Sequence, residues 1–326
     1  MLLDGSTSAN VERAATALAA GELVAFPTET VYGLGARADD DAAVAKIFAA
    51  KGRPADHPLI VHVADADAAR VFATSVPPVA VRLVAAFWPG PLTVIVPRAA
   101  GVAAAATGGQ STIGLRCPAH PVAHALLRSA RERGVPGVAA PSANRFGRIS
   151  PTQAAHVRSE FGESLLVLDG GACEVGIESS IVDCSRGRPV LLRPGVLTRA
   201  QIEAAAGEPL HERDDAAPRA SGTLESHYAP RATLRLMPAP MLHTALQMLG
   251  GSPLELAVYS KPLPAGLARG LRHRTMPERA DAVAQELFSV LRAFDDEGAQ
   301  LIWVEEPPAG PEWEGVRDRL RRAAAR

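Results

Sequence analysis

Cysteine is scarce in this sequence, and long apolar runs are missing from it. The three cysteines, Cys117, Cys173 and Cys184, form no Cys-x-x-Cys pair and are too few for a disulfide framework, so we expect buried thiols in a reducing compartment. No stretch approaches about 18 uninterrupted apolar residues, and no basic segment followed by an apolar stretch begins the chain. The sequence therefore predicts no membrane span and no export signal, and we expect a cytoplasmic protein without a membrane partner.

Two common phosphate-binding signatures are also absent from the sequence. It contains neither a GxxxxGK loop followed by Ser or Thr nor a GxGxxG fingerprint, so a bound nucleotide would need another kind of site. The formal net charge is -1 over 326 residues, which argues against a protein that coats nucleic acid but leaves room for a local basic cleft. Any charged partner must therefore be recognised locally.

The apolar pattern predicts an α/β protein with two units and a linker. Up to residue 206, short strand-like runs such as LVAF and LTVIV alternate with amphipathic helical segments such as DDDAAVAKIFAAKG. Residues 207–231 are polar, rich in turn formers and longer than most connections within a domain. Residues 232–326 resume the alternation and suffice for a small α/β domain. We therefore predict domains at 1–206 and 232–326, joined by a linker at 207–231.

Lysine is rare among the cations of this chain. Of 34 basic residues, only Lys46, Lys51 and Lys261 are not arginines. Lys51 lies two positions before Arg53, at the mouth of the strand-like run LIVHV. An ammonium is a compact point charge and a guanidinium is a planar fork, so the two together suit a polyphosphate. The alternative interpretation is a solvent-exposed helix C-terminus, which also favours cations.

Polar side chains also flank several other strand-like runs. Because loops converge at one edge of an α/β sheet, we expect these segments to meet. Arg116 and Arg193 each end an apolar run, which favours an anionic partner for both. Thr28 and Thr30 could orient a small polar ligand, or their hydroxyls could stabilise a turn.

The remaining candidates have competing structural explanations. Ser142 and Asn144 lie in PSANRFG between turn formers, where such residues are usually structural. Tyr228 lies in the linker segment SHYAPR, where its ring could stack on a base, cap a pocket or only pin the linker to a domain surface. His120 and His124 have the spacing of a metal pair, but no third ligand accompanies them in a recognised pattern, so we predict no zinc site.

Several motifs, taken in order, resemble one family. The chain carries FPTETVYGLGA, KGRP with HPLIVHV, STIGLRCP, PSAN, GIESSIVD, LLRPG and SGTLESHYAP in the order typical of threonylcarbamoyl-AMP synthases. It resembles the long form of these enzymes, in which a YrdC-like domain is joined to a smaller C-terminal domain. The resemblance implies a YrdC-like twisted open mixed sheet with helices, plus a smaller Rossmann-like α/β C-terminal domain.

The resemblance also implies an activity. A nucleotidyltransferase of this family would condense L-threonine, bicarbonate and ATP into threonylcarbamoyl-AMP and pyrophosphate, with Mg²⁺ carried in by the ATP rather than held at a metal site of the protein. A separate tRNA threonylcarbamoyl transferase complex would use the product to modify adenosine beside the anticodon. The resemblance leaves room for a weak contact with RNA.

The resemblance implies ligand contacts for particular residues. ATP would contact Lys51, Arg53, His57, Thr112, Ser142, Asn144, Ser150, Arg193 and Tyr228. Threonine would contact Thr30, His62, Arg116, Ala140 and Ser179. Lys51 and Arg53 would be the catalytic pair that meets the phosphates. His57 and Ser180 depart from the usual family pattern, which has Asn and Thr there, so their roles are the least defined.

Two other functions compete with this one. A carbamoyl-adenylate-forming enzyme of the hydrogenase-maturation kind uses a similar domain, but the paired zinc-binding cysteines and the acylphosphatase-like region of those longer proteins are missing here. An RNA-binding or ribosome-associated module would instead use a concave basic cleft. Tight, salt-dependent RNA binding without ATP turnover would distinguish that module from an enzyme.

Overall fold

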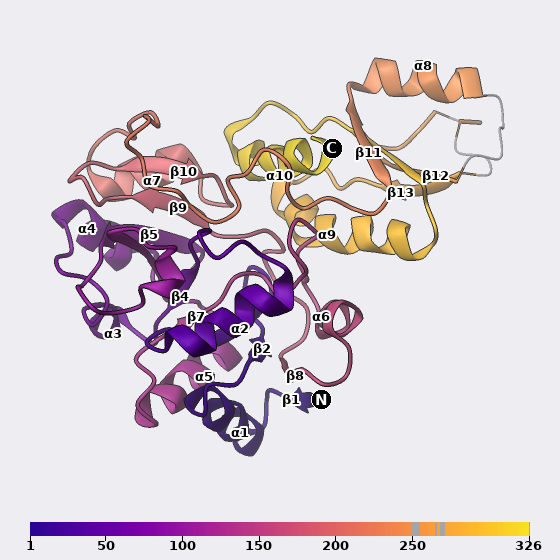
Figure 1. Ribbon diagram of the computed structural model, residues 1–326. Coiled ribbons are helices and arrows are strands. Elements are labelled where there is room, and N and C mark those ends of the chain that lie inside the picture. The colour runs from indigo at the N-terminus through magenta and orange to yellow at the C-terminus, as the bar shows by residue number, and fades with distance from the viewer. Residues whose placement is uncertain (250–254, 265, 268–270, 326) are drawn as a thin grey trace.

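Two β-sheets with their helices organise the chain, for which the computed structural model describes residues 1–249, 255–264, 266–267 and 271–325. Figure 1 shows an N-terminal unit, coloured indigo to salmon, beside a smaller C-terminal unit in orange and yellow. Residues 250–254, 265, 268–270 and 326 of the predicted second domain lie outside the described residues. Among the described residues, no helix is both long enough and apolar enough to cross a bilayer.

A mixed sheet forms the N-terminal unit. Its strands are β1 (Leu2–Asp4), β2 (Val24–Phe26), β3 (Gly33–Arg37), β4 (Ile60–His62), β5 (Leu92–Pro97), β6 (Thr112–Arg116), β7 (Val138–Ala139), β8 (Leu166–Asp169), β9 (Ser180–Asp183) and β10 (Val190–Arg193). They follow the order β1-β8-β2-β3-β7-β4-β6-β5-β9-β10. Strand β6 pairs parallel with β4 and antiparallel with β5. The predicted mixed sheet is therefore confirmed.

Helices cover both faces of this sheet. They are α1 (Ser8–Ala19), α2 (Asp41–Lys51), α3 (Ala66–Ala69), α4 (Pro78–Phe87), α5 (Pro121–Glu132), α6 (Ala154–Phe161) and α7 (Arg199–Ala206), with a 3-10 turn η1 (Ala105–Thr107). Because neighbouring strand residues point to opposite faces, Val24 and Phe26 pack with α1 and α5, whereas Ala25 packs with α2, α4 and α7. The sheet is thus the middle layer of three.

The C-terminal unit repeats this design on a smaller scale. Its strands are β11 (Thr233–Met237), β12 (Leu256–Ser260), β13 (Arg272–Thr275) and β14 (Leu301–Glu305), and its helices are α8 (Ala239–Leu249), α9 (Ala280–Asp296) and α10 (Glu314–Ala324), with a 3-10 turn η2 (Pro311–Trp313). The sheet is parallel, in the order β11-β14-β12-β13. Helix α8 packs on one face, and α9 and α10 pack on the other. The predicted small α/β unit is confirmed.

One apolar core joins the two units. Val31, Ile149 and Ile177 of the N-terminal unit pack in the same cluster as the buried faces of α9 and α10, and Tyr228 of the linker belongs to that cluster. Burial of this kind contributes about 25 cal/mol per Å² of apolar surface, so docking of the second unit is favourable. The domain boundaries at 206 and 232 stay a prediction.

The linker packs against the large sheet. Residues 207–231 are all described, and within them no helix or strand forms, apart from isolated bridges of His211 with Val190 and of Ala229 with Arg148. Ala217 and Ala220 pack against apolar side chains of β4, β5, β9 and β10. The linker therefore lies over the face formed by β4, β5, β9 and β10, and its residues 221–228 reach the edge at which β4, β6 and β10 end.

Candidate active site

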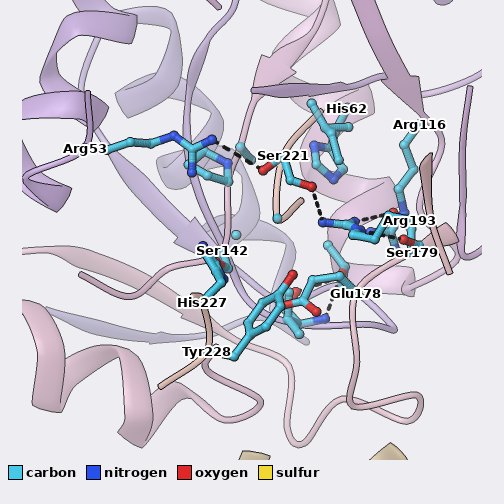
Figure 2. A pocket seen from close by; sticks show the side chains of 17 residues that line it. Arg53, His62, Arg116, Ser142, Glu178, Ser179, Arg193, Ser221, His227 and Tyr228 are labelled. Carbon is cyan, nitrogen blue, oxygen red and sulfur yellow. Dashed lines mark hydrogen bonds between the residues drawn. The ribbon is translucent and has the colours of Figure 1, made fainter. Parts of the chain in front are cut away.

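A pocket lies where the linker meets this edge of the large sheet (Figure 2). Its lining consists of Thr28, Val31, Gly33, Arg53, Ile60, His62, Arg116, Ala140, Pro141, Ser142, Glu178, Ser179, Arg193, Ser221, Gly222, His227 and Tyr228. The structure thus brings together eight residues that the sequence assigned to ATP or threonine: Arg53, His62, Arg116, Ala140, Ser142, Ser179, Arg193 and Tyr228. With the linker in place, the cavity is only about 40 Å³.

Lys51 is the last residue of α2, yet it is buried. Asp40 caps the start of this helix by accepting from the main-chain N–H groups of Ala42 and Ala43, and Gly52 ends it in a left-handed conformation. The Lys51 side chain therefore lies against the loop at 142–145. Its Nζ donates to the carbonyl of Ser142 at 2.6 Å and to the carbonyl of Asn144. With the residue 3% exposed, the solvated helix-end interpretation is wrong.

Arg53 and Arg193 point into the pocket and are also buried. Arg53 donates from Nη2 to the Pro58 carbonyl at 3.0 Å and to Ser221 Oγ at 3.5 Å. Arg193, at the end of β10, donates to the Ser179 carbonyl at 3.0 Å, to Ser179 Oγ at 3.2 Å and to the Ser221 carbonyl at 2.9 Å. These partners are all neutral oxygens.

Three buried basic side chains thus lie in or beside this pocket without a direct hydrogen bond to a carboxylate among the described residues. Among the described residues, Lys51, Arg53 and Arg193 donate hydrogen bonds only to carbonyls and hydroxyls. Burial, reinforced by Arg53, lowers the pKa of Lys51 well below its ordinary value. Burial also lowers the pKa of Arg53 to about 10. Because buried charges are usually paired, this arrangement calls for an anionic ligand.

Arg116 differs from these three because it has a carboxylate partner. It ends β6, and its Nη2 lies 2.8 Å from Oε1 of Glu29, with both side chains under 10% exposed. The anionic partner expected for Arg116 therefore exists within the chain itself. Next to it, burial and the Arg116 charge lower the pKa of His62 to about 3, so the imidazole is neutral at pH 7. His62 Nδ1 is buried without a hydrogen-bond partner among the described residues.

In the turn before β3, a threonine hydroxyl forms hydrogen bonds with the backbone of the turn. Thr28 Oγ1 donates to the Val31 carbonyl at 2.7 Å and accepts from the Val31 and Thr30 N–H groups. It also lies 2.9 Å from Thr30 Oγ1. The turn interpretation of these hydroxyls is confirmed, and a role for Thr30 in ligand binding stays a prediction.

Asn144 and Ser150 lie beneath the pocket wall. Asn144 Nδ2 donates to the carbonyls of Arg145 and Arg148 at 2.8 and 2.9 Å, which fixes the loop that carries Ser142. Ser150 Oγ donates to Glu178 Oε1. Ligand roles for both residues stay predictions.

Six predicted residues do not line the main pocket: Thr30, Lys51, Asn144 and Ser150, described above, and Thr112 and His57. Thr112 lines an adjoining cavity of about 20 Å³, which shares Ile60 and Ser221 with the main pocket. His57 is partly buried against the ring of Phe146, with centroids 5.4 Å apart. Thr112 therefore lies near the site, across the shared residues Ile60 and Ser221, whereas His57 lines neither cavity.

The linker closes the pocket with two buried rings. Tyr228 is 1% exposed, and its centroid lies 4.2 Å from that of His227 and 5.5 Å from that of Phe288. Its φ of 62° is unusual for a non-glycine residue. Its Oη is buried without a hydrogen-bond partner among the described residues, and a Cβ on Gly222 would overlap it. A residue held in such a strained conformation is a candidate for function.

Sequence reasoning missed several residues of the site. Glu178 and Ser221 lie in quoted motifs, so the motifs themselves could have identified them. Arg319 lies in α10 and contacts Glu178, but a single arginine in an amphipathic helix gives no local signal. Only the tertiary structure brings it to the site.

The chemistry that this pocket offers is charge neutralisation and positioning. Burial raises the pKa of the Cys173 thiol to about 12 and that of the Cys117 thiol to about 11, so neither is a reactive thiolate. All three cysteines are buried, as predicted. Among the described residues, no group of three or more His, Cys, Asp or Glu side chains could hold a metal. Three arginines and two neutral histidines, His62 and His227, line the small cavity, and Lys51 lies behind Ser142.

Known families match both units of the chain. The family described as "Telomere recombination" matches residues 16–195, and the family described as "Threonylcarbamoyl-AMP synthase, C-terminal domain" matches residues 197–325. The threonylcarbamoyl-AMP synthase of Bacillus subtilis is 39% identical over 326 residues, covering 96% of this chain and 92% of that protein. The protein of the same name from Pyrococcus abyssi is 38% identical over 316 residues, covering 93% and 91%.

Solved structures agree with this match. Sua5 of P. abyssi complexed with L-threonine superposes with a TM-score of 0.87 at 36% identity, covering 98% of this chain and 95% of that chain. A double-alanine variant of the same protein gives a TM-score of 0.90 at 34% identity, covering 99% and 96%. The likeness therefore extends over both units and the linker.

Proposed function

Because this chain belongs to the threonylcarbamoyl-AMP synthase family, we propose that it condenses L-threonine, bicarbonate and ATP into threonylcarbamoyl-AMP and pyrophosphate. One observation supports this most directly. Lys51, Arg53 and Arg193 converge from three separate segments, all buried and all bound only to neutral oxygens. A triphosphate would supply the missing negative charge and replace these oxygens with stronger charge-assisted bonds.

The reaction needs no protein nucleophile. The threonine amine and bicarbonate first form a carbamate with loss of water. A carbamate oxygen then attacks the α-phosphorus of ATP, the bond from that phosphorus to the bridging oxygen breaks, and pyrophosphate leaves with the electron pair. Lys51 and Arg53 would stabilise the charge that builds on the departing pyrophosphate. Mg²⁺ bound to the ATP would neutralise part of the same charge.

The part of the pocket lined by His62, Arg116 and Ser179 suits an amino acid. P. abyssi Sua5 has been solved with L-threonine, and four of the five residues assigned to threonine here, Arg116, His62, Ala140 and Ser179, line one pocket, whereas Thr30 does not line it. The neutral imidazole of His62 can exchange a hydrogen bond with the amino acid without adding charge. Val31 and Ile60 provide apolar lining for a methyl group. Serine should then be a poorer substrate, by roughly tenfold, rather than an inert one.

The linker would act as a lid. A cavity of about 40 Å³ is far below the roughly 300 Å³ of an ordinary ligand site, so ATP can enter only if residues 221–228 move. Closure of these residues over the bound substrates would exclude water from a labile adenylate. We place the reaction in the cytoplasm, where a tRNA threonylcarbamoyl transferase complex would take up the product.

Pyrophosphate release tests this function. With purified protein, release from ATP and Mg²⁺ should require both threonine and bicarbonate, and mass spectrometry should detect threonylcarbamoyl-AMP. Release that ignores threonine would contradict the proposal. Turnover with carbamoyl phosphate instead would favour carbamoyl-adenylate formation, and salt-dependent RNA binding without turnover would favour an RNA-binding module.

A further inference from the structure

Arg319 is a fully buried arginine that the C-terminal unit inserts beside the pocket. It lies in α10, its side chain is 0% exposed, and it is among the largest fully buried side chains of the described residues. Its Nε donates to Glu178 Oε2 at 2.7 Å, and its Nη2 donates to the Glu178 carbonyl at 3.1 Å. Its Nη1 donates to the Pro194 carbonyl and to Asp318 Oδ2, both at 2.8 Å.

The two segments that Arg319 holds both carry pocket residues. Glu178 directly precedes Ser179, and Pro194 directly follows Arg193. Strands β9 and β10 pair antiparallel, so the start of one and the end of the other lie at the same edge of the sheet. Arg193 spans this gap by donating to the carbonyl and the hydroxyl of Ser179. Arg319 therefore binds both chain segments, at the residue before Ser179 and at the residue after Arg193.

Glu178 connects the same guanidinium to the rest of the site. Its other carboxylate oxygen accepts from Ser150 Oγ. Burial alone would raise the pKa of Glu178, but the charges of Arg319 and Arg193 hold it below its usual range. The Arg319 guanidinium also lies 5.3 Å from the ring centre of Tyr228, within cation–π distance. One side chain of the second unit thus contacts Glu178 and Tyr228 directly and is connected to Ser150 through Glu178.

We propose that Arg319 is a positioning residue for the reaction, through which the C-terminal unit holds Ser179 and Arg193 at the separation that threonine and the phosphates require. This inference rests on the proposed function. It also explains why an arginine occupies this place, because only a planar fork with five donors can serve two carboxylates and two carbonyls together. Arg319 itself need not touch a ligand.

Substrate affinity and turnover test the proposal. In Arg319→Met, we expect threonine to bind at least about tenfold more weakly by calorimetry, and kcat/KM to fall by about 100-fold, because small misplacements of binding groups have effects of that size. Arg319→Lys should lie in between, since an ammonium keeps the Glu178 ion pair but cannot reach both carbonyls. Thermal denaturation shows whether each variant is folded.

A double variant separates positioning from charge compensation. Arg319→Met leaves the buried Glu178 carboxylate without its partner, which by itself destabilises the protein. In Arg319→Met with Glu178→Gln, we expect the melting temperature to recover while threonine affinity stays below that of Glu178→Gln alone, the reference needed because Glu178 lines the pocket. Recovery of both would mean that Arg319 only balances a charge, and would overturn the proposal.

A control variant removes a different ion pair between α10 and the N-terminal unit. Arg199 of α7 forms an ion pair at 3.1 Å with Glu314 of α10, between the units but away from the pocket, and Arg199 is 42% exposed. Arg199→Met should leave threonine affinity and kcat unchanged. Equal losses in Arg199→Met and Arg319→Met would mean that any weakening of domain docking harms the site, which also overturns the proposal.

Hydrogen–deuterium exchange gives a test that is independent of the substrates. In the ligand-free protein, amides of residues 178–182 and 190–195 should exchange at least about tenfold faster in Arg319→Met than in the wild type, whereas β2 and β8 should be unaffected. If the wild type released no pyrophosphate, the proposed function would fail and this measurement would still stand. Unchanged exchange in these segments, with threonine affinity intact, would overturn the role of Arg319.

Discussion

The Nζ atom of Lys51 donates a hydrogen bond of 2.6 Å to the main-chain oxygen of Ser142. This bond links the end of α2 to the segment after β7, and a second bond reaches the carbonyl of Asn144 in the same segment. Carbonyl oxygens orient an ammonium without neutralising it. The amino group of Lys51 is therefore held in place beside a pocket residue, where its protonated form would be available to a phosphate.

ATP binding should be accompanied by proton uptake. Burial and Arg53 lower the pKa of Lys51, and a triphosphate would favour the ammonium again. At about pH 8, we expect the calorimetric enthalpy of binding a non-hydrolysable ATP analogue to differ between Tris and HEPES, whose ionisation enthalpies differ. Lys51→Met should remove most of this difference. Equal enthalpies for the wild type in both buffers would show that Lys51 is already protonated.

Replacement of Lys51 should reduce turnover more than binding. In Lys51→Ala we expect kcat to fall by at least about tenfold, because the charge acts on the departing pyrophosphate. Lys51→Arg should recover only part of the rate, since a planar fork does not reproduce a point charge. Lys46→Ala is the control, because Lys46 is on the same helix and pairs with Glu22 at the surface. Wild-type rates in Lys51→Ala would remove Lys51 from the mechanism.

Gly222→Ala should disable the lid. Gly222 has a φ of 73°, and a Cβ there would overlap Tyr228 Oη and lie 2.8 Å from Arg193 Nη1. We expect a loss of about 1–2 kcal/mol in unfolding free energy from the backbone strain and a large loss of kcat from the displaced groups. Gly187→Ala has the same strain, with a φ of 76° and no neighbour within 4 Å. Its activity should be normal, and equal activity in the two variants would contradict the prediction.

Local sequence signals predicted the scaffold of the site well. The acids at 39–41, the apolar spacing and Gly52 are typical of a helix that ends at Lys51, and LIVHV of the strand that follows it. Arg116 and Arg193 end β6 and β10 as expected. These features depend on neighbours along the chain, which a sequence displays directly.

Features that depend on distant contacts could not be predicted in this way. Strand β3 is not among the strand-like runs of the sequence because its segment GLGAR is rich in glycine, and Gly33 and Gly35 allow Phe26 of the neighbouring strand to pack closely. The pairing of Glu178 with Arg319 joins residues 141 positions apart. The closed linker likewise results from packing of Tyr228 on Phe288 of the second unit.

Ligands should protect the linker from trypsin. Arg213 and Arg219 are exposed in a segment without helix or strand, so both are accessible cleavage sites. With an ATP analogue and threonine bound beneath the lid, we expect cleavage to slow by at least about tenfold. Tyr228→Ala should lose most of this protection. Cleavage at equal rates with and without ligands would mean that the linker is only a tether.

Stability should fall as the pH drops below about 6.5. Burial, mainly, lowers the pKa of His62 and of His227 to about 3 each in the folded protein. Between about pH 3 and pH 6.5 the unfolded chain therefore binds protons at these positions that the folded chain does not, and unfolding becomes easier as the pH falls. Each histidine should lower the unfolding free energy by about 1.4 kcal/mol per pH unit within this window, and by nothing above pH 7.5.

Denaturant titrations between pH 7.5 and pH 5 measure this effect. In His62→Gln or His227→Gln, the pH dependence should become shallower by about 1.4 kcal/mol per pH unit, whatever the variant does to stability at pH 7.5, because the proton-binding difference is gone. His211→Gln provides a comparison with an exposed histidine of the linker that does not line the pocket. A slope that His62→Gln does not alter would show that the imidazole can take up a proton inside the folded pocket, and would remove the basis for treating it as a neutral partner of threonine.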